Sequence, residues 1–331
     1  MSEYHTPVML NESISALITN PEGIYADATF GGGGHTAELL SRLHDGGRVI
    51  AFDRDSDALH QRPDDSRLTL IHNNFRFIRN YQLYLGVDEG FDGILADLGV
   101  SSHQFDTAER GFSFRWDAEL DMRMNTEGGK TAADVLNTYS EAEIEKILKV
   151  YGEVDGASRM ARMIVSARAG KEIRTTGDLH DAIEKALPSF QEHKVLAKIY
   201  QALRIEVNDE MRSLEKFLEG AAEALKVGGR LVVITYHSLE DRMVKNFTKT
   251  GNIGGVEEKD IYGRVATPLS AVNRKPILPS EEEIAANTRA RSAKLRIAEK
   301  AGTMESGSMN AGTVKAGAMK AGAEKAGRAG R

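Results

Sequence analysis

The chain has 331 residues, with 43 Lys and Arg against 49 Asp and Glu, no Cys, and a formal net charge of -6. An apolar fraction of 41% beside 28% charged residues is ordinary for a globular protein and excludes a wholly disordered or collagen-like chain. The absence of Cys excludes thiol catalysis, a disulfide scaffold and Cys-ligated zinc or iron–sulfur centres.

The two ends of the chain carry no targeting or membrane signal. The start has no basic segment followed by an apolar one, and no stretch approaches the roughly 18–20 apolar residues of a membrane span. We therefore expect a cytoplasmic protein. Residues 301–331 repeat Ala-Gly and hold five Lys or Arg against two Glu, which predicts a flexible, basic tail. The remaining acidic body argues against a nonspecific duplex-DNA coat, but leaves room for a local basic surface that binds RNA.

The first third of the chain alternates strand and helix signals. Short apolar runs at 23–27, 48–53, 68–72 and 91–98 predict strands, and leucines at helical spacing predict a helix over 35–43. Short apolar strands separated by helices are typical of a parallel sheet with helices on both faces. The predicted fold class is therefore α/β.

The pattern changes after the fourth strand. No strand of the buried type occurs between 105 and 206, and the segment from Ser140 onward is mostly helical, opened by the capping box Ser140-x-x-Glu143. Sheet signals then return, with a helix over 211–225 that Gly228-Gly229 follows, a strand over 230–236 and a helix over 237–247. The predicted domains are an α/β domain formed by 1–104 and 207–300, an inserted helical domain at 105–206 that faces RNA, and the tail at 301–331.

A glycine-rich turn between the first strand and the first helix is the strongest local signal. Its sequence runs from Asp27 to His35 with four consecutive Gly, and Asp53 ends the next strand. A turn and a carboxylate in this arrangement are typical of a site for a nucleoside-bearing cofactor, with the carboxylate on the ribose. A dinucleotide normally requires a third Gly where Thr36 stands. Asp27 suits a cationic amino group, so a methyl donor such as S-adenosylmethionine is favoured, and the dinucleotide remains an alternative.

Two further polar residues end predicted strands. Asp97 follows the fourth strand and His237 follows the late strand, and ligands in open α/β sheets bind outside these carboxyl ends. Asp97 could accept a hydrogen bond from an exocyclic amine, although the Pro-Pro-aromatic sequence that often follows such an acidic residue is missing. His237 could take a proton or position the base, although a lone His is more often structural.

The segment 101–124 mixes aromatic rings with arginines. Such a mixture can stack a base and hold phosphate, or it can simply pack a domain junction. The residues that we predict to contact RNA are Arg110, Arg115, Trp116 and Arg123.

These strings together resemble the bacterial ribosomal RNA (cytosine-N4)-methyltransferases of the RsmH/MraW group, from His5 to about Glu299. The resemblance rests on long motifs in the right order. They are DATFGGGGH at 27–35, FDRD at 52–55, DLGVSS at 97–102, ERGFSF at 109–114, LDMRM at 120–124, QALRI at 201–205, VN at 207–208, HSLEDR at 237–242 and RSAKLR at 291–296. Departures are small: Thr288 stands where Pro is common, and the tail has no counterpart.

The resemblance implies a seven-stranded class I methyltransferase domain with a helical insertion after Asp97. It implies methyl transfer from S-adenosylmethionine to the N4 amine of a cytosine in the decoding centre of 16S rRNA, without a metal. Asp97 and His237 are then the predicted catalytic residues. The implied cofactor-binding residues are Gly33, Gly34, His35, Asp53, Phe75, Asp97 and Gln104.

Two other functions remain as alternatives. A dinucleotide oxidoreductase is disfavoured by the missing third Gly, and a noncatalytic RNA-binding assembly factor is disfavoured by the intact Asp27, Asp53 and Asp97. The expected partner is 16S rRNA in the small ribosomal subunit or in a late assembly intermediate, with no membrane. The sequence does not fix the oligomeric state, and a homodimer is one option.

Overall fold

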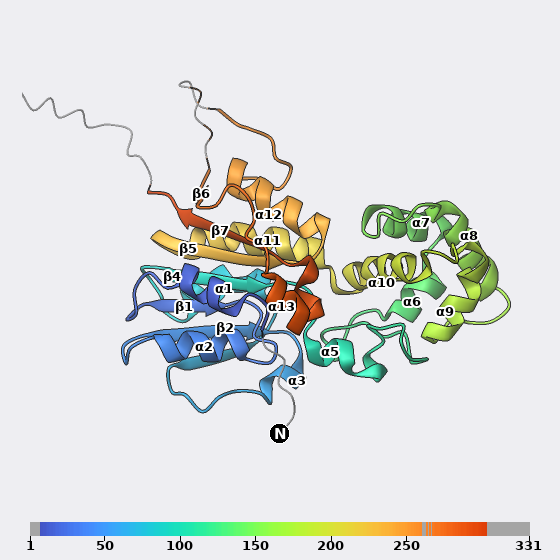
Figure 1. Cartoon of the computed structure of the whole chain (residues 1–331), viewed down its shortest axis with the longest axis horizontal. Coiled ribbons are helices and arrows are strands. Elements are labelled where there is room, and N and C mark those ends of the chain that lie inside the picture. Colours follow the sequence, from blue (N-terminus) through green and yellow to red (C-terminus); the bar gives the residue numbers. More distant parts are fainter. Residues whose placement is uncertain (1–6, 260–262, 264, 266, 303–331) are drawn as a thin grey trace, which may run out of the picture. The chain divides into compact units, whose positions relative to one another are not determined.

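The computed structural model describes residues 7–259, 263, 265 and 267–302 (Figure 1). The predicted tail, apart from its first two residues, lies outside the described residues. The described residues up to Ala301 belong to one compact unit. The predicted division at 104/105 and 206/207 falls inside this unit and therefore stays a prediction.

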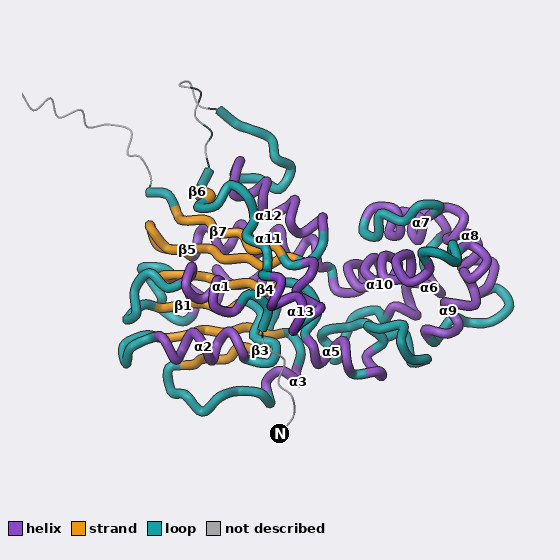
Figure 2. The backbone as a smooth tube through the Cα atoms, in the orientation of Figure 1, coloured by secondary structure: helices purple, strands orange, loops and turns teal. Residues whose placement is uncertain are grey.

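A seven-stranded sheet forms the centre of the fold (Figure 2). Its order is β3-β2-β1-β4-β5-β7-β6; β1 to β5 pair in parallel, and β7 is antiparallel to both of its neighbours. The seven strands expected from the resemblance are thus confirmed. Their bounds are β1 Ile24–Asp27, β2 Arg48–Asp53, β3 Leu68–His72, β4 Phe91–Asp97, β5 Leu225–Thr235, β6 Leu269–Ala271 and β7 Lys294–Lys300.

The strands alternate their apolar side chains between two cores, because successive side chains point to opposite faces of a sheet. In β4, Leu95 packs on the side of α1 (Leu10–Leu17) and α2 (Gly34–Arg42). Ile94 and Ala96 pack on the opposite side. That second face is covered by α4 Ile78–Tyr84, α11 Glu210–Ala224 and α12 Ser238–Thr250. Helices on both faces explain why the central strand β4 is buried along almost its whole length.

The glycine pair at 228–229 was predicted to follow a helix directly, but it lies inside a strand. The helix α11 already ends at Ala224, and β5 begins at Leu225 instead of Arg230. The pairing register between β4 and β5 shifts here, from Phe91 opposite Leu225 to Gly93 opposite Arg230. The glycines therefore lie in an irregular stretch of the strand, where Gly228 has a φ of 78°.

Between 105 and 206, all of which are described, the structure contains helices and no strand, as predicted. Helices α6 to α10 share a core of their own, formed by residues such as Leu136, Ile164 and Leu203. The predicted capping box of Ser140 and Glu143 is present at the start of α7. The bounds are α6 Ala132–Thr138, α7 Glu141–Val150, α8 Ala157–Arg168, α9 Thr176–Ile183 and α10 Glu192–Asn208.

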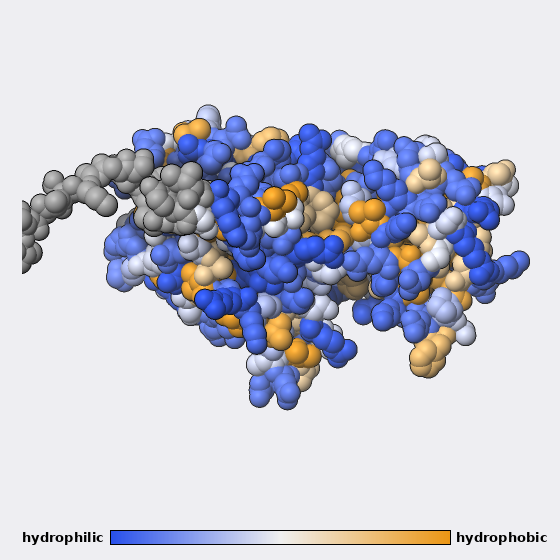
Figure 3. Space-filling view, turned by 90° about the horizontal axis from the view of Figure 1, so that it is seen from above, coloured by the Kyte–Doolittle hydropathy of each residue, from blue (hydrophilic) through white to orange (hydrophobic). Residues whose placement is uncertain are grey.

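Three short helices, α3 Ser56–Leu59, α5 Ser102–Asp106 and α13 Glu281–Ala286, complete the described α-helices. The face seen in Figure 3 is mostly hydrophilic, with small scattered apolar groups. Within the described residues, no helix combines the length and the apolar character needed to cross a membrane.

Candidate active site

A cavity of about 950 Å³ opens where β1, β2 and β4 end. Its position agrees with the rule that ligands of open α/β sheets bind at the carboxyl ends of the strands. Among the residues predicted to bind cofactor, Gly33 does not line the cavity. Those that do are Gly34, His35, Asp53, Phe75, Asp97 and Gln104.

The glycine turn forms one wall of this cavity. Gly31 and Gly33 have φ angles of 53° and 77°, which side chains rarely adopt. At Gly33 a Cβ would also lie 2.8 Å from the Phe30 ring, whereas a Cβ at Gly32 would meet nothing within 4 Å. Gly33 therefore shapes the turn as the residue that precedes helix α2, and Gly31 and Gly32 present backbone to the cavity.

Asp27 holds the turn from behind and does not line the cavity. Its carboxylate is fully buried and accepts hydrogen bonds from the Thr36 hydroxyl at 2.6 Å and the Thr29 amide at 3.0 Å. Burial raises its pKa. The interpretation of Asp27 as the partner of a cationic amine is therefore not supported, because the Asp27 carboxylate is directed at the turn.

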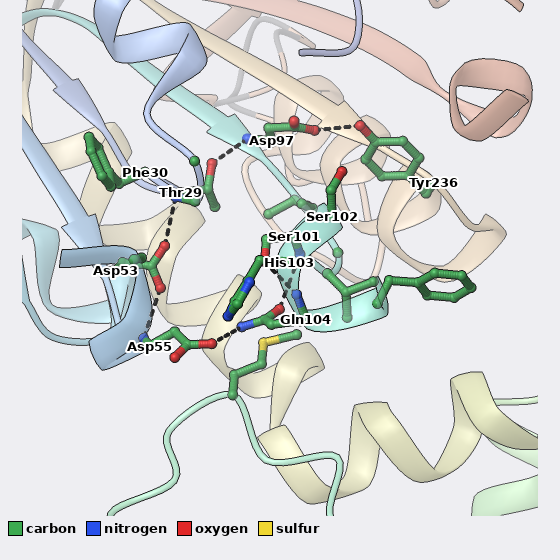
Figure 4. Close-up of a pocket in the computed structure, with 18 of the residues that line it drawn as sticks. Thr29, Phe30, Asp53, Asp55, Asp97, Ser101, Ser102, His103, Gln104 and Tyr236 are labelled. Carbon is green, nitrogen blue, oxygen red and sulfur yellow. Dashed lines mark hydrogen bonds between the residues drawn. The ribbon is translucent and has the colours of Figure 1, made fainter. Parts of the chain in front are cut away.

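Asp53 joins the glycine turn to the segment after β2 (Figure 4). Its carboxylate accepts hydrogen bonds from the Gly31 amide at 2.7 Å and from the Asp55 amide at 2.8 Å. Burial raises the pKa of Asp53. Each carboxylate oxygen can accept a further hydrogen bond. Asp53 is thus fixed at the cavity wall with acceptor capacity left for hydroxyl groups.

Phe75 and Gln104 close other parts of the wall. Phe75 begins a 3₁₀ turn after β3, and its ring meets that of Phe217 edge-on at 5.1 Å between centroids. The Gln104 side chain is buried. It accepts a hydrogen bond from the Ser101 amide and donates one to the Asp55 carboxylate at 2.7 Å. Both side chains are therefore held in place before any ligand binds.

Asp97 lies at the end of β4 between the side chains of Tyr236 and His35. Its Oδ1 accepts the Tyr236 hydroxyl at 2.7 Å, and its Oδ2 lies 3.8 Å from His35 Nδ1. The Asp97 amide donates to the Thr29 hydroxyl, which ties β4 to the glycine turn (Figure 4). Burial raises the pKa of Asp97 to about 6, against the lowering effects of His35 and Tyr236.

The His35 ring connects this carboxylate to the start of the described chain. Its Nε2 lies 3.1 Å from the carbonyl oxygen of Val8, an acceptor, so Nε2 carries the proton. In the neutral ring Nδ1 then has a free lone pair on the side of Asp97. At 3.8 Å from Asp97 Oδ2 this nitrogen is beyond hydrogen-bond distance of the carboxylate.

The structure separates the two predicted catalytic residues. Asp97 lines the cavity, whereas His237 does not. The His237 side chain is buried at the start of α12, where Nδ1 caps the Glu240 amide and Nε2 lies 3.2 Å from the Glu240 carboxylate. The preceding residue, Tyr236, lines the cavity instead. Tyr236 was not predicted as a site residue, and its only signal in the sequence is its place at the end of a predicted strand.

A second polar cluster borders the cavity. Ligand atoms of Glu210, His237 and Glu240 lie within 4.8 Å of one another, a set that could hold a metal ion. Arg204 donates two hydrogen bonds to Glu210, at 2.8 and 2.9 Å. Against the raising effect of burial, His237 and then Arg204 lower the pKa of Glu240. The guanidinium already supplies positive charge to this cluster, so we interpret it as an ion-pair network.

The residues predicted to contact RNA have different surroundings. Arg110 is buried and pairs with Asp55 at 2.9 Å and Asp57 at 3.1 Å, so its charge is used inside the protein. Arg123 forms a two-point pair with Asp121. Neither residue lines the cavity.

Arg115 and Trp116 remain accessible. Arg115 lines the main cavity, and both residues line a smaller pocket of about 190 Å³ beside α9 and α10. The Trp116 side chain is 44% exposed. Of the four predicted RNA-contacting residues, these two are the exposed ones, whereas Arg123 is half-buried and Arg110 is buried.

The comparisons with known proteins agree with this geometry. A family model described as the MraW methylase family matches residues 2–301. The chain belongs to the MraW methylase family. It is 56% identical to a protein of Phocaeicola vulgatus and 55% identical to one of Bacteroides fragilis, each over 297 residues, covering 90% of this chain and 97% of the relative. A Flavobacterium johnsoniae protein is 52% identical over 298 residues, covering 90% and 98%. All three relatives are named ribosomal RNA small subunit methyltransferase H.

Proposed function

We propose that this MraW methylase family member transfers a methyl group from S-adenosylmethionine to the N4 amine of a cytosine in the decoding centre of 16S rRNA. The observation that carries the proposal is Asp97. It is a carboxylate at the end of a central strand, held by Tyr236, with a cavity in front of it that the glycine turn and Asp53 also line. The relatives' names give the substrate class, ribosomal RNA of the small subunit.

The cavity residues fit S-adenosylmethionine. Gly31 and Gly32 present backbone without a side chain, Asp53 has spare acceptor capacity, and Phe75 offers a fixed ring. A cavity of about 950 Å³ lies at the upper end of the ~300–1,000 Å³ usual for small-molecule sites, so it has room for a nucleobase beside the cofactor. When bound, the cofactor supplies an electrophilic methyl group on a sulfonium. We propose that Asp53 binds the ribose hydroxyls and Phe75 packs on the adenine.

Asp97 would prepare the acceptor amine. The N4 lone pair of cytosine is delocalised into the ring, which makes the amine a poor nucleophile. A carboxylate that accepts an N4–H bond favours a pyramidal nitrogen and leaves the lone pair free to attack. Since Tyr236 occupies Oδ1, the Oδ2 atom is the one available to the amine.

The proton released by the amine needs an acceptor. Asp97 has a pKa of about 6, close enough to neutrality to take a proton transiently, and His35 Nδ1 lies 3.8 Å from its Oδ2. His237 has no comparable position, so we assign it to the network with Glu240. Most of the remaining acceleration would come from holding the two reacting groups in line.

A methylation assay tests the function. The protein is incubated with labelled S-adenosylmethionine and small ribosomal subunits from cells that lack the enzyme, and the labelled nucleoside is identified. N4-methylcytidine in 16S rRNA is the expected product. Label only in free rRNA or an assembly intermediate would keep the chemistry and change the substrate. Cofactor binding without label in any of these RNAs would contradict the proposal and favour a noncatalytic assembly factor.

A further inference from the structure

Two arginines from distant parts of the chain meet over one aromatic ring at the cavity. The ring is that of Phe105 in α5. The guanidinium carbon of Arg115 lies 5.5 Å from the ring centroid, and that of Arg289, in the 3₁₀ turn Thr288–Ser292, lies 5.4 Å from it. All three residues line the cavity. Both distances are within the ~6 Å range of favourable cation–π contact.

The charge at this point is not balanced. Arg289 pairs with Asp106 at 2.6 Å. The part of the chain that the structure describes gives the exposed Arg115 guanidinium no carboxylate partner. One nitrogen of Arg289, Nη1, is buried without a hydrogen-bond partner. The Arg115 charge is therefore not neutralised by a carboxylate of the described residues, and an anion placed between the two guanidinium groups would gain favourable interactions with both.

The other two arginines among the described residues of the cavity wall, Arg204 and Arg54, already donate hydrogen bonds to groups of the protein. Arg204 makes two hydrogen bonds to Glu210. Arg54 donates to the Asn208 carbonyl and to the Met124 sulfur, and burial lowers its pKa. Arg115 and Arg289 are thus the two arginines of the wall with capacity for a ligand.

An RNA substrate brings an anion to this place. A base that is modified by an enzyme has to leave its stack and enter the active site, and the phosphates beside it stay on the strand at the entrance. Phosphate contacts of arginines fix the register of the nucleic acid without reading its sequence. A planar guanidinium matches the two oxygens of a phosphate.

We propose that Arg115 and Arg289, aligned by the Phe105 ring, form the binding site for a backbone phosphate next to the target cytidine. This inference rests on the proposed function and adds a substrate-positioning site to it. Arg115 comes from the segment before the helices α6 to α10, and Arg289 comes from the segment before β7. A bound phosphate would therefore connect two parts of the chain that are far apart in sequence.

The test compares Arg115→Gln, Arg289→Gln and the double variant with the unmodified protein. Binding to unmethylated small subunits is measured as a function of salt, and S-adenosylmethionine binding is measured separately by calorimetry. Arg48→Gln is the matched control. Arg48 is exposed at the amino end of β2, whereas the cavity lies at the carboxyl ends of the strands, so this variant removes a charge far from the cavity.

We expect the double variant to bind subunits about 10-fold more weakly, with a salt slope less steep by about 0.7–0.9, which is the loss of one phosphate contact. Its affinity for S-adenosylmethionine should stay within about twofold of the control. Its thermal unfolding midpoint should stay within about 2 °C of the control. Phe105→Leu keeps both charges and removes the ring, so an intermediate loss is expected, which gives a second test if the double variant folds poorly.

An unchanged salt slope and an unchanged affinity for subunits in the double variant would overturn the proposal. A loss of S-adenosylmethionine affinity equal to the loss of RNA affinity would also overturn it, because the anion would then be the cofactor's carboxylate. If no RNA is methylated by the unmodified protein but the salt slope still falls in the variant, the phosphate site stands and the proposed function fails.

Discussion

At the residue scale, Asp97 combines a cost to stability with a chemical task. Its carboxylate has a pKa of about 6 against an ordinary value of 3.8, because the site is buried. A raised pKa means that the folded protein binds the proton more tightly than the unfolded chain does. The free energy of unfolding therefore falls as pH rises from about 4 to 6, and the cost remains in full at neutral pH.

Replacing Asp97 by Asn separates these two effects. We expect kcat to fall by about 10²–10⁴-fold, because the amide is a much weaker acceptor for the N4–H group and cannot take the proton. We also expect the variant to be about 1–3 kcal/mol more stable than the unmodified protein at pH 8, since an ionised buried group is removed. Turnover and chemical denaturation at pH 4 and pH 8 measure both.

The stability gain should vanish near pH 4, where Asp97 is protonated in the folded protein. Unchanged turnover would remove Asp97 from the chemistry. A loss of stability at pH 8 would contradict the burial argument.

Tyr236 tunes the same carboxylate. Its hydroxyl donates to Asp97 Oδ1 and favours the ionised form, so Tyr236→Phe should raise the pKa of Asp97 further. Activity requires the carboxylate and is lost as pH falls through this pKa. The acidic limb of the kcat profile should therefore move from about pH 6 upward by about one unit, while kcat at pH 9 changes by less than about 10-fold.

The exposed Tyr84 provides the control, as Tyr84→Phe should leave the profile in place. An acidic limb that does not move in Tyr236→Phe would mean that another group controls the pH dependence.

At the scale of elements, the turn between β1 and α2 depends on where the backbone needs Gly. Gly33→Ala should destabilise the protein by about 1–3 kcal/mol and weaken cofactor binding, because φ is 77° and the new Cβ would lie 2.8 Å from Phe30. Gly32→Ala is the matched variant, because its Cβ meets nothing within 4 Å. Urea unfolding gives the free energy of unfolding of both variants. An equal loss of stability in the two would contradict the turn geometry.

The strands differ in how much of them could be predicted. The strands β1 to β4 and the end of β5 were predicted because each is a short apolar run between turn or helix signals. Strand β7 was not predicted from the residues because four of the seven residues in its sequence, KLRIAEK, are charged. It becomes the inner antiparallel strand because Leu295, Ile297 and Ala298 pair with β5 and bury on both faces. Such pairing between 231 and 298 is a tertiary fact that no local pattern contains.

At the scale of the whole molecule, Arg110 connects the sheet to the segment that leads into the helices α6 to α10. It pairs with Asp55 and Asp57 after β2, and it donates to the carbonyl oxygens of Arg123 and Met124. Its charge is thus paired inside the protein, although its Nε is buried without a hydrogen-bond partner, and its part in RNA binding stays a prediction.

Arg110→Met should destabilise the protein by about 3–5 kcal/mol, because the buried Asp55 loses the guanidinium that compensates its charge. The salt slope of subunit binding should remain that of the unmodified protein below the melting temperature. Thermal melts and the salt titration used for Arg115 measure the two effects. A reduced salt slope with full stability would restore Arg110 as an RNA contact.

The sequence by itself determined the order of the main elements, the glycine turn, the acidic strand ends and the family. These features are local strings or periodic patterns, and a single segment is enough to show them. Tertiary structure alone decided which way each side chain points and which charges are paired inside the protein. Asp27, Arg110 and His237 face partners inside the protein, whereas Tyr236 and Arg289 reach the cavity. The physical reason is that a polar group's role depends on whether its hydrogen bonds and charge are already satisfied, and hydrogen-bond partners lie up to 274 positions apart along the chain.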